Sequence, residues 1–199
     1  MELILWRHAD AEEGMPDEAR ALTPKGDKQA RRMAQWLNER LPNDALILAS
    51  PAVRAQQTAA ALEREVLTVS ELGVGATVAQ VFKAAFWPRA SRVTVVVGHQ
   101  PVLGEAAALL LAGLDVPISV KKGSAWWFTS RERQGRVQVV LRQRLDEGDE
   151  ADKGAGVWVT PPLSLSSSQG SVQSAPAPVP LRAQASAPAG VVLSLREMI

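Results

Sequence analysis

The sequence predicts an α/β fold in three layers, an α/β/α sandwich in which a mainly parallel β-sheet lies between helices on both faces. Two observations carry this prediction. Short runs of mainly apolar residues recur through the first 145 residues, and amphipathic segments suited to helices separate them. A strand that is covered on both faces reads as a continuous apolar run, and strands that alternate with helices are typical of parallel sheets.

Five apolar runs are predicted as strands. They lie at residues 3–6, 45–49, 93–97, 125–129 and 137–141. The third run is rich in β-branched residues, which favour strands. A polar turn around Gln134 and Gly135 is predicted to join the last two. Of the neighbours Trp126 and Trp127 we expect one in the core and the other exposed or under the tail, because adjacent strand residues point to opposite faces.

Helices are predicted between these strands, at residues 24–41, 51–66, about 76–87 and 102–112. The first begins with Thr23 as a candidate N-cap and Pro24 at the first helical position, where its fixed φ is favourable. Pro42 ends its periodic pattern. Gly113 is suited to close the last helix, because glycine readily adopts the left-handed conformation of a C-terminal cap.

The composition changes after residue 145. Acidic residues come first, and residues 161–190 are then mainly Pro, Ser, Ala and Gly. Such a stretch buries too little apolar surface to offset the entropy lost on ordering. We therefore predict a domain over 1–145 and a low-complexity, largely disordered tail over 146–199. Within that tail, 157–159 and 191–195 are candidates for short strands.

Composition also excludes several classes of function. The chain of 199 residues has a net charge of +1 and no cysteine or tyrosine. It therefore has no disulfide scaffold, cysteine nucleophile or thiolate zinc site, and it lacks the basic stripe of a nucleic-acid-binding protein. No apolar run approaches the ~20 residues of a membrane span, and the first residues do not resemble a signal peptide. The expectation is a cytoplasmic protein without nucleic-acid or membrane partners.

Polar side chains follow three of the predicted strands. Arg7 and His8 end the first strand, Arg54 lies shortly after the second, and His99 ends the third. Ligands of open α/β sheets bind beyond the carboxyl ends of the strands. Guanidinium groups match phosphate oxygens, and an imidazole nitrogen can attack phosphorus. These four residues therefore predict a phosphate site. With only two histidines in the chain, a metal site or cofactor is not expected.

Four segments in order resemble the signature motifs of the histidine phosphatase superfamily, which is phosphoglycerate mutase-like in fold, and most closely those of its phosphohistidine phosphatase SixA branch. One Arg-His-Ala alone would carry no weight, whereas four motifs at suitable spacing do. The motifs are Arg7-His8-Ala9, Leu22-Thr23-Pro24-Lys25-Gly26, Ser50-Pro51-Ala52-Val53-Arg54-Ala55-Gln56-Gln57-Thr58 and Gly98-His99-Gln100-Pro101.

The resemblance implies a metal-independent phosphatase. His8 would be the nucleophile that forms a phosphohistidine intermediate, and Arg7, Arg54 and His99 would bind the phosphate. The implied substrate is phosphohistidine on a phosphorelay protein, such as a phosphotransfer domain. Two alternatives stay open: a phosphatase for a small phosphate ester, and a catalytically silent domain that binds phosphorylated proteins. We interpret Ser50 as a helix cap rather than a substrate contact, and Thr23 and Gly26 as a cap and a turn.

The general acid is the least defined part of the resemblance. Gln100 stands where the acid-phosphatase branch has an aspartate, and the interval from Arg54 to His99 is too short for the mutase insertion that carries a glutamate. Glu71 is the nearest positional candidate. Three carboxylates near the nucleophile are further ones: Asp10, Glu12 and Glu13. The short interval also predicts little lid and an open site, which suits a phosphate displayed on another protein.

Overall fold

A computed structural model describes residues 1–113, 118–133 and 136–145. These residues form a six-stranded sheet in the order β3-β2-β4-β1-β5-β6. The pairs β3–β2, β2–β4 and β4–β1 are parallel, and β1–β5 and β5–β6 are antiparallel. The strands are β1 (Glu2–Arg7), β2 (Leu46–Ala49), β3 (Leu67–Thr68), β4 (Thr94–Gly98), β5 (Ala125–Arg133) and β6 (Arg136–Leu145).

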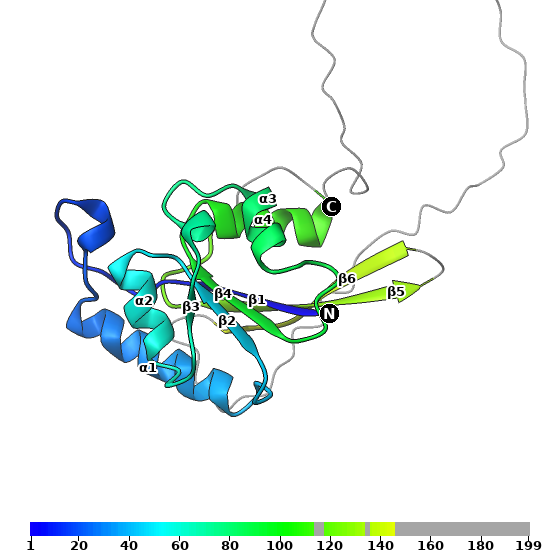
Figure 1. Ribbon diagram of the computed structural model, residues 1–199, viewed down its shortest axis with the longest axis horizontal. Helices are drawn as coiled ribbons and strands as arrows, with labels where there is room; N and C mark the ends of the chain where they lie inside the picture. Colours follow the sequence, from blue (N-terminus) through cyan, green and yellow to red (C-terminus); the bar gives the residue numbers. More distant parts are fainter. Residues whose placement is uncertain (114–117, 134–135, 146–199) are drawn as a thin grey trace, which may run out of the picture. The chain divides into compact units, whose positions relative to one another are not determined.

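Helices cover both faces of this sheet. In Figure 1, α1 and α2 lie on one side of the strands, and α3 and α4 lie on the other. The α-helices are α1 (Pro24–Asn38), α2 (Val53–Ala60), α3 (Val78–Ala84) and α4 (Val102–Ala112), and two short 3-10 helices are η1 (Asp17–Ala19) and η2 (Ser70–Leu72). The three-layer α/β prediction is confirmed.

The second helix is much shorter than the sequence predicts. The helix expected over 51–66 is only α2, because Glu63 adopts a left-handed φ of 55° that a helix cannot accommodate. The residues after it form the short strand β3, which was not predicted. The Thr23 side chain accepts a hydrogen bond from the Gly26 backbone, as expected of an N-cap. Gly26 itself is helical rather than in a turn, and a Cβ there would lie 1.9 Å from the Asp10 carbonyl oxygen.

The core is divided between the two faces of the sheet. Trp6 packs toward α1 and α2, whereas its neighbour Leu5 packs with the α4 side. Trp126 and Trp127 are both buried in the core, so the expectation that only one would be is wrong. Trp127 lies edge-on to Trp36 of α1, with ring centroids 6.3 Å apart, and Trp126 belongs to the opposite cluster. Both faces of β5 are therefore covered.

Strand register places the polar ends side by side. Arg7 of β1 is paired with Gly98 of β4, so the next residues, His8 and His99, leave the sheet at the same level. The His8 backbone N–H donates to the Gly98 carbonyl at 3.0 Å. The Ser50 backbone N–H, just after β2, donates to the Val97 carbonyl at 3.0 Å. Three adjacent parallel strands thus deliver their carboxyl ends to one edge.

Two predictions lie outside the described residues: the tail over 146–199 and the turn at 134–135. Among the helices of the described ranges, none is both long and apolar enough to cross a membrane.

Candidate active site

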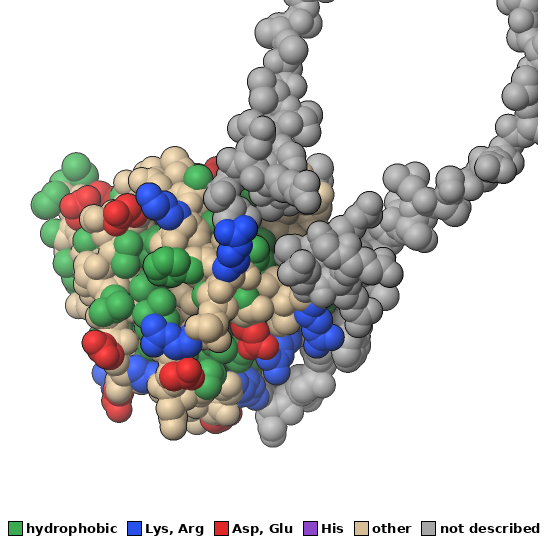
Figure 2. Space-filling view, turned by 45° about the vertical axis from the view of Figure 1, so that its right-hand side comes forward, with side chains coloured by type: hydrophobic (Ala, Val, Ile, Leu, Met, Phe, Trp, Pro, Cys, Tyr) green, Lys and Arg blue, Asp and Glu red, His purple; other side chains and the backbone are tan. Residues whose placement is uncertain are grey.

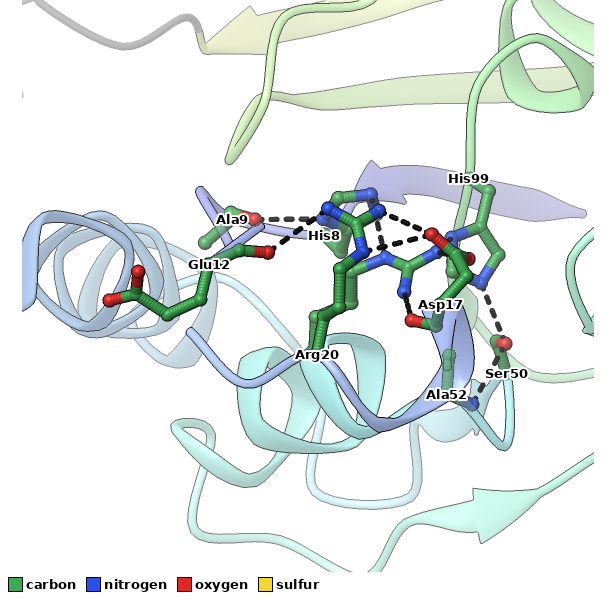
Figure 3. A network of polar contacts seen from close by, with 9 residues as sticks. His8, Ala9, Glu12, Asp17, Arg20, Ser50, Ala52 and His99 are labelled. Atoms are coloured by element: carbon green, nitrogen blue, oxygen red, sulfur yellow. Dashed lines mark hydrogen bonds and ion pairs between the residues drawn. The ribbon is translucent and has the colours of Figure 1, made fainter. Parts of the chain in front are cut away.

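His8 and His99 form the centre of the site. Their ring centroids are 5.2 Å apart, and the rings are tilted by 54°. Their exposed fractions are only 7% and 4%. In agreement, no histidine is visible among the described residues on the face shown in Figure 2. The close-up in Figure 3 shows how the residues around the two rings lie.

Hydrogen bonds fix the orientation and the tautomer of His8. Its Nδ1 lies 2.7 Å from the Ala9 carbonyl oxygen, which can only accept, so Nδ1 carries the hydrogen. Its Nε2 is then unprotonated, and its lone pair accepts a hydrogen bond from Nε of Arg54 at 3.3 Å. The unprotonated nitrogen of His8 is therefore Nε2, and it faces a guanidinium group.

His99 is held in the corresponding way. Its Nδ1 lies 3.4 Å from Nη2 of Arg54, which can only donate, so Nε2 carries the hydrogen. That Nε2–H donates to the Ser50 hydroxyl at 2.8 Å. The same hydroxyl accepts from the Ala52 backbone N–H at 3.3 Å, at the start of α2. The Ser50 hydroxyl therefore orients His99. The N-cap of α2 is Ala52 and no side chain caps this helix, so the sequence interpretation of Ser50 as a helix cap is wrong.

Arg54 connects both histidines from the first turn of α2, where it is 3% exposed. Its backbone carbonyl accepts from the Thr58 hydroxyl at 2.6 Å. The same hydroxyl accepts from the Ala9 backbone N–H at 3.0 Å. Thr58 thus ties the helix that carries the guanidinium to the residue after His8. The Ser-Pro motif therefore positions a cation as well as starting a helix.

Asp17 and Arg20 complete the network, and sequence reasoning did not single them out. Nη1 of Arg54 donates to the Asp17 carbonyl at 2.6 Å, and Nη2 donates to Oδ2 of Asp17 at 2.8 Å. Nη2 of Arg20 lies 2.6 Å from Oδ1 of the same carboxylate, and Nη1 donates to the Glu12 carbonyl at 3.1 Å. The only sequence signal is an acid and an arginine three residues apart in the segment after the nucleophile.

This segment makes the site closed rather than open. Residues 12–20 bring Asp17 and Arg20 against Arg54, and both histidines are buried. The expectation of an open site is therefore wrong for this structure. The short interval from Arg54 to His99 did not predict this cover, because the covering residues 12–20 come from a different part of the sequence, shortly after His8.

Arg7 lies at the edge of the network. Its Nη1 donates to the Val120 carbonyl at 2.7 Å, while its Nε is buried and has no hydrogen-bond partner. Burial lowers the pKa of this guanidinium, although arginine keeps its charge at working pH. A buried donor without a partner is costly unless an acceptor fills the position. A phosphate oxygen is an acceptor of the required kind.

Both histidines are neutral near pH 7. Burial lowers the pKa of His8 to about 3, and the charges of Arg54 and Arg7 add to this effect against the hydrogen bond to Ala9. Burial lowers the pKa of His99 to about 4, with Arg54 acting in the same direction and Asp17 opposing it. A neutral His8 is the nucleophilic form.

The carboxylates considered as general acids do not contact the two rings. Glu71 lies on η2 with an exposed side chain, and the Ser70 hydroxyl donates to it at 2.8 Å, which lowers its pKa. Asp10 lies 2.6 Å from Lys122, which lowers its pKa. A lowered pKa opposes proton donation. Glu71 thus stays a prediction based on position, and the described residues include no group of three His, Cys, Asp or Glu side chains that could hold a metal.

Comparison with known sequences identifies the family. A model of the histidine phosphatase superfamily (branch 1) matches residues 3–72. An uncharacterised protein from Picosynechococcus sp. (strain ATCC 27264 / PCC 7002 / PR-6) is 35% identical over 130 residues, which are 57% of this chain and 74% of that protein.

Solved structures agree with this result. A protein from Nakamurella multipartitia that bears the name phosphohistidine phosphatase SixA has a TM-score of 0.63 and 25% identity, over 73% of this chain and 95% of that one. Phosphoserine phosphatase from Entamoeba histolytica shares the fold, with a TM-score of 0.56 and 19% identity over 74% of this chain and 98% of that one. The ordered motifs, the paired histidines and these matches show that the chain belongs to the histidine phosphatase superfamily (branch 1).

Proposed function

We propose that the protein is a metal-independent phosphatase that works through a phosphohistidine at Nε2 of His8. The observation that carries this proposal is the orientation of His8: Nδ1–H is bound to the Ala9 carbonyl, and the unprotonated Nε2 accepts a hydrogen bond from Arg54. A neutral imidazole in a fixed tautomer, beside a permanent cation, is suited to attack a phosphoryl group.

The reaction has two steps. In the first, the Nε2 lone pair forms a bond to phosphorus, while the bond from phosphorus to the leaving group breaks and its electron pair leaves with that group, which takes up a proton. In the second, water attacks phosphorus, the P–N bond breaks, and its electrons return to Nε2. The products are inorganic phosphate and neutral His8, with the water proton released. Arg54, Arg7 and His99 stabilise the negative charge on the phosphoryl oxygens in both steps.

We propose phosphohistidine on a protein as the substrate. No carboxylic acid among the described residues contacts the two rings, so the site suits a leaving group that needs little protonation. The P–N bond of phosphohistidine is labile, and imidazole leaves more readily than an alkoxide. The name of the structurally similar protein from Nakamurella multipartitia points to the same class of substrate.

A groove beside the site supports a protein partner. We call it the α1 groove; Lys28, Arg32, Met33 and Gly123 are among the residues that line it, and none of its described lining residues is acidic. The Gly123 backbone N–H donates to the carbonyl of His8 at 3.1 Å, so a residue that lines the groove contacts the backbone of His8. Such a surface fits acidic residues that flank a phosphohistidine.

A labelling experiment tests the proposal. The full chain is incubated with a small phosphodonor and examined by mass spectrometry for an acid-labile phosphate adduct. We expect the adduct in the wild type and not in His8→Ala. Hydrolysis of a phosphohistidine peptide should be faster than that of sugar phosphates. The reverse ranking would favour a phosphatase for small esters, and phosphopeptide binding without an adduct would favour a silent binding domain.

A further inference from the structure

We propose that Asp17 is an internal competitor of phosphate: its carboxylate occupies Arg54 in the empty site and must withdraw when a phosphoryl group binds. This inference rests on the proposed function, because it takes Arg54 to be a phosphate ligand. It assigns a role to a residue that lies between the signature motifs.

The number of hydrogen-bond donors on Arg54 limits how it can bind phosphate. A guanidinium has five N–H groups. One points to His8, two to Asp17 and one to His99, at distances between 2.6 and 3.4 Å. Only one donor is left, whereas bidentate binding of phosphate needs two. A phosphoryl group that is held by Arg54 in this way must therefore displace an existing partner.

Of the partners of Arg54, the Asp17 carboxylate is the one that the negative charge of a phosphate would displace. A phosphate dianion placed on Arg54 would meet the negative carboxylate, and like charges at this distance repel. The two histidines are uncharged, so they offer no such repulsion. The Arg54 hydrogen bond lowers the pKa of Asp17, so the carboxylate is ionised at neutral pH and the competition persists there.

The carboxylate can also leave without losing all its contacts. Asp17 and Arg20 belong to the same segment, three residues apart, with side chains 41% and 25% exposed. Their ion pair can move outward together, while Arg54 stays on α2. The expected consequence is weaker binding of every phosphate, including the product, which would otherwise be held by the same cations.

The test uses Asp17→Asn in the full chain, with Asp27→Asn as the matched control. Asp27 is also paired with an arginine, Nε of Arg31 at 3.0 Å, but on the exposed surface of α1. The affinity for inorganic phosphate is measured by isothermal titration calorimetry. We expect Asp17→Asn to bind phosphate about tenfold more tightly, and Asp27→Asn to bind it as the wild type does. Inhibition by product phosphate should strengthen by the same factor.

Other outcomes distinguish failure of the competitor role of Asp17 from failure of the proposed function. If Asp17→Asn binds phosphate more weakly or equally, Asp17 positions Arg54 instead, and the competitor role is wrong. Asp17→Ser, which removes the carboxylate without an isosteric amide, should give the same tightening and serves if the asparagine variant is unstable. If the wild type neither binds phosphate nor forms an adduct on His8, the proposed function itself fails.

Discussion

Nε of Arg54 lies 3.3 Å from Nε2 of His8, so the guanidinium and the unprotonated ring nitrogen are in direct contact. The same guanidinium reaches His99 at 3.4 Å. One side chain on α2 thereby defines where both rings point. The following predictions start from this arrangement.

Replacing Arg54 with lysine should remove catalysis while retaining the charge. A lysine ammonium is a compact point charge without the planar fork that serves His8, Asp17 and His99 together. We expect the rate of phosphoenzyme formation to fall by about 100-fold or more, measured in single turnovers with a small phosphodonor. Arg31→Lys makes the same exchange on the surface of α1 and should leave the rate unchanged. A rate near that of the wild type in Arg54→Lys would mean that charge alone suffices.

Ser50→Ala should disturb His99 rather than the fold. Its hydroxyl is the acceptor for Nε2–H of His99 at 2.8 Å. Without it this N–H has no acceptor, and the ring is held only through Nδ1 by Arg54. We expect kcat to fall about tenfold and the ¹⁵N NMR signals of the His99 ring to change. Ser70→Ala on η2 is the control for loss of a hydroxyl near the sheet edge. Unchanged His99 signals would show that Ser50 does not orient the ring.

Thr58→Val should lower stability. The valine is nearly isosteric, but it leaves the buried Ala9 backbone N–H without its acceptor at 3.0 Å. The free energy of unfolding should fall by about 1–3 kcal/mol, measured by urea denaturation. Thr58→Ser keeps the hydroxyl and should recover most of this loss. Equal losses in both variants would point to the methyl group instead.

Stability should decrease on acidification below about pH 6.5. In the folded protein the pKa values of His8 and His99 are lowered from 6.5 to about 3 and about 4. Between these values the unfolded chain binds protons that the folded chain does not, so the free energy of unfolding rises with pH in that window. The slope should reach at most about 1.4 kcal/mol per pH unit for each histidine. Denaturation curves of His99→Gln should show a shallower slope, and an equal slope would contradict the assignment.

Charge reversal in the α1 groove should affect peptide substrates selectively. Two phosphohistidine peptides are compared, one with aspartate and glutamate flanks and one with asparagine and glutamine flanks. For Lys28→Glu/Arg32→Glu we expect KM for the acidic peptide to rise about tenfold, with little change for the neutral one and for a small phosphodonor. Arg31→Glu/Lys83→Glu makes the same change in net charge outside the groove. If both double variants behave alike, the groove has no special role.

The strand-end residues could be predicted because geometry leaves them little freedom. A buried parallel strand has a recognisable composition, and its carboxyl end must lie at one edge of the sheet. His8, Arg54 and His99 follow from that rule and from the ordered motifs, and the structure brings them together.

The features of the fold and the site that could not be predicted from the sequence depend on contacts between distant segments or on local backbone conformation. Asp17 and Arg20 lie in a segment without apolar periodicity, so only folding shows that they reach Arg54. The burial of both Trp126 and Trp127 required knowing that β5 pairs with β1 inside the sheet. The early end of α2 depends on the backbone conformation of Glu63, which composition does not reveal.

The pairing of Arg7 with Gly98 fixes the register of β1 against β4, and with it the positions of the site residues that follow both strands. One residue inserted in β1 would shift every later side chain by about 3.3 Å and turn it to the opposite face of the sheet. Arg7 would then take the place of His8, and His8 would take the place of Ala9. Backbone hydrogen bonds between the two strands therefore set the distance between the two imidazoles. Core substitutions that preserve both strands should leave this distance unchanged.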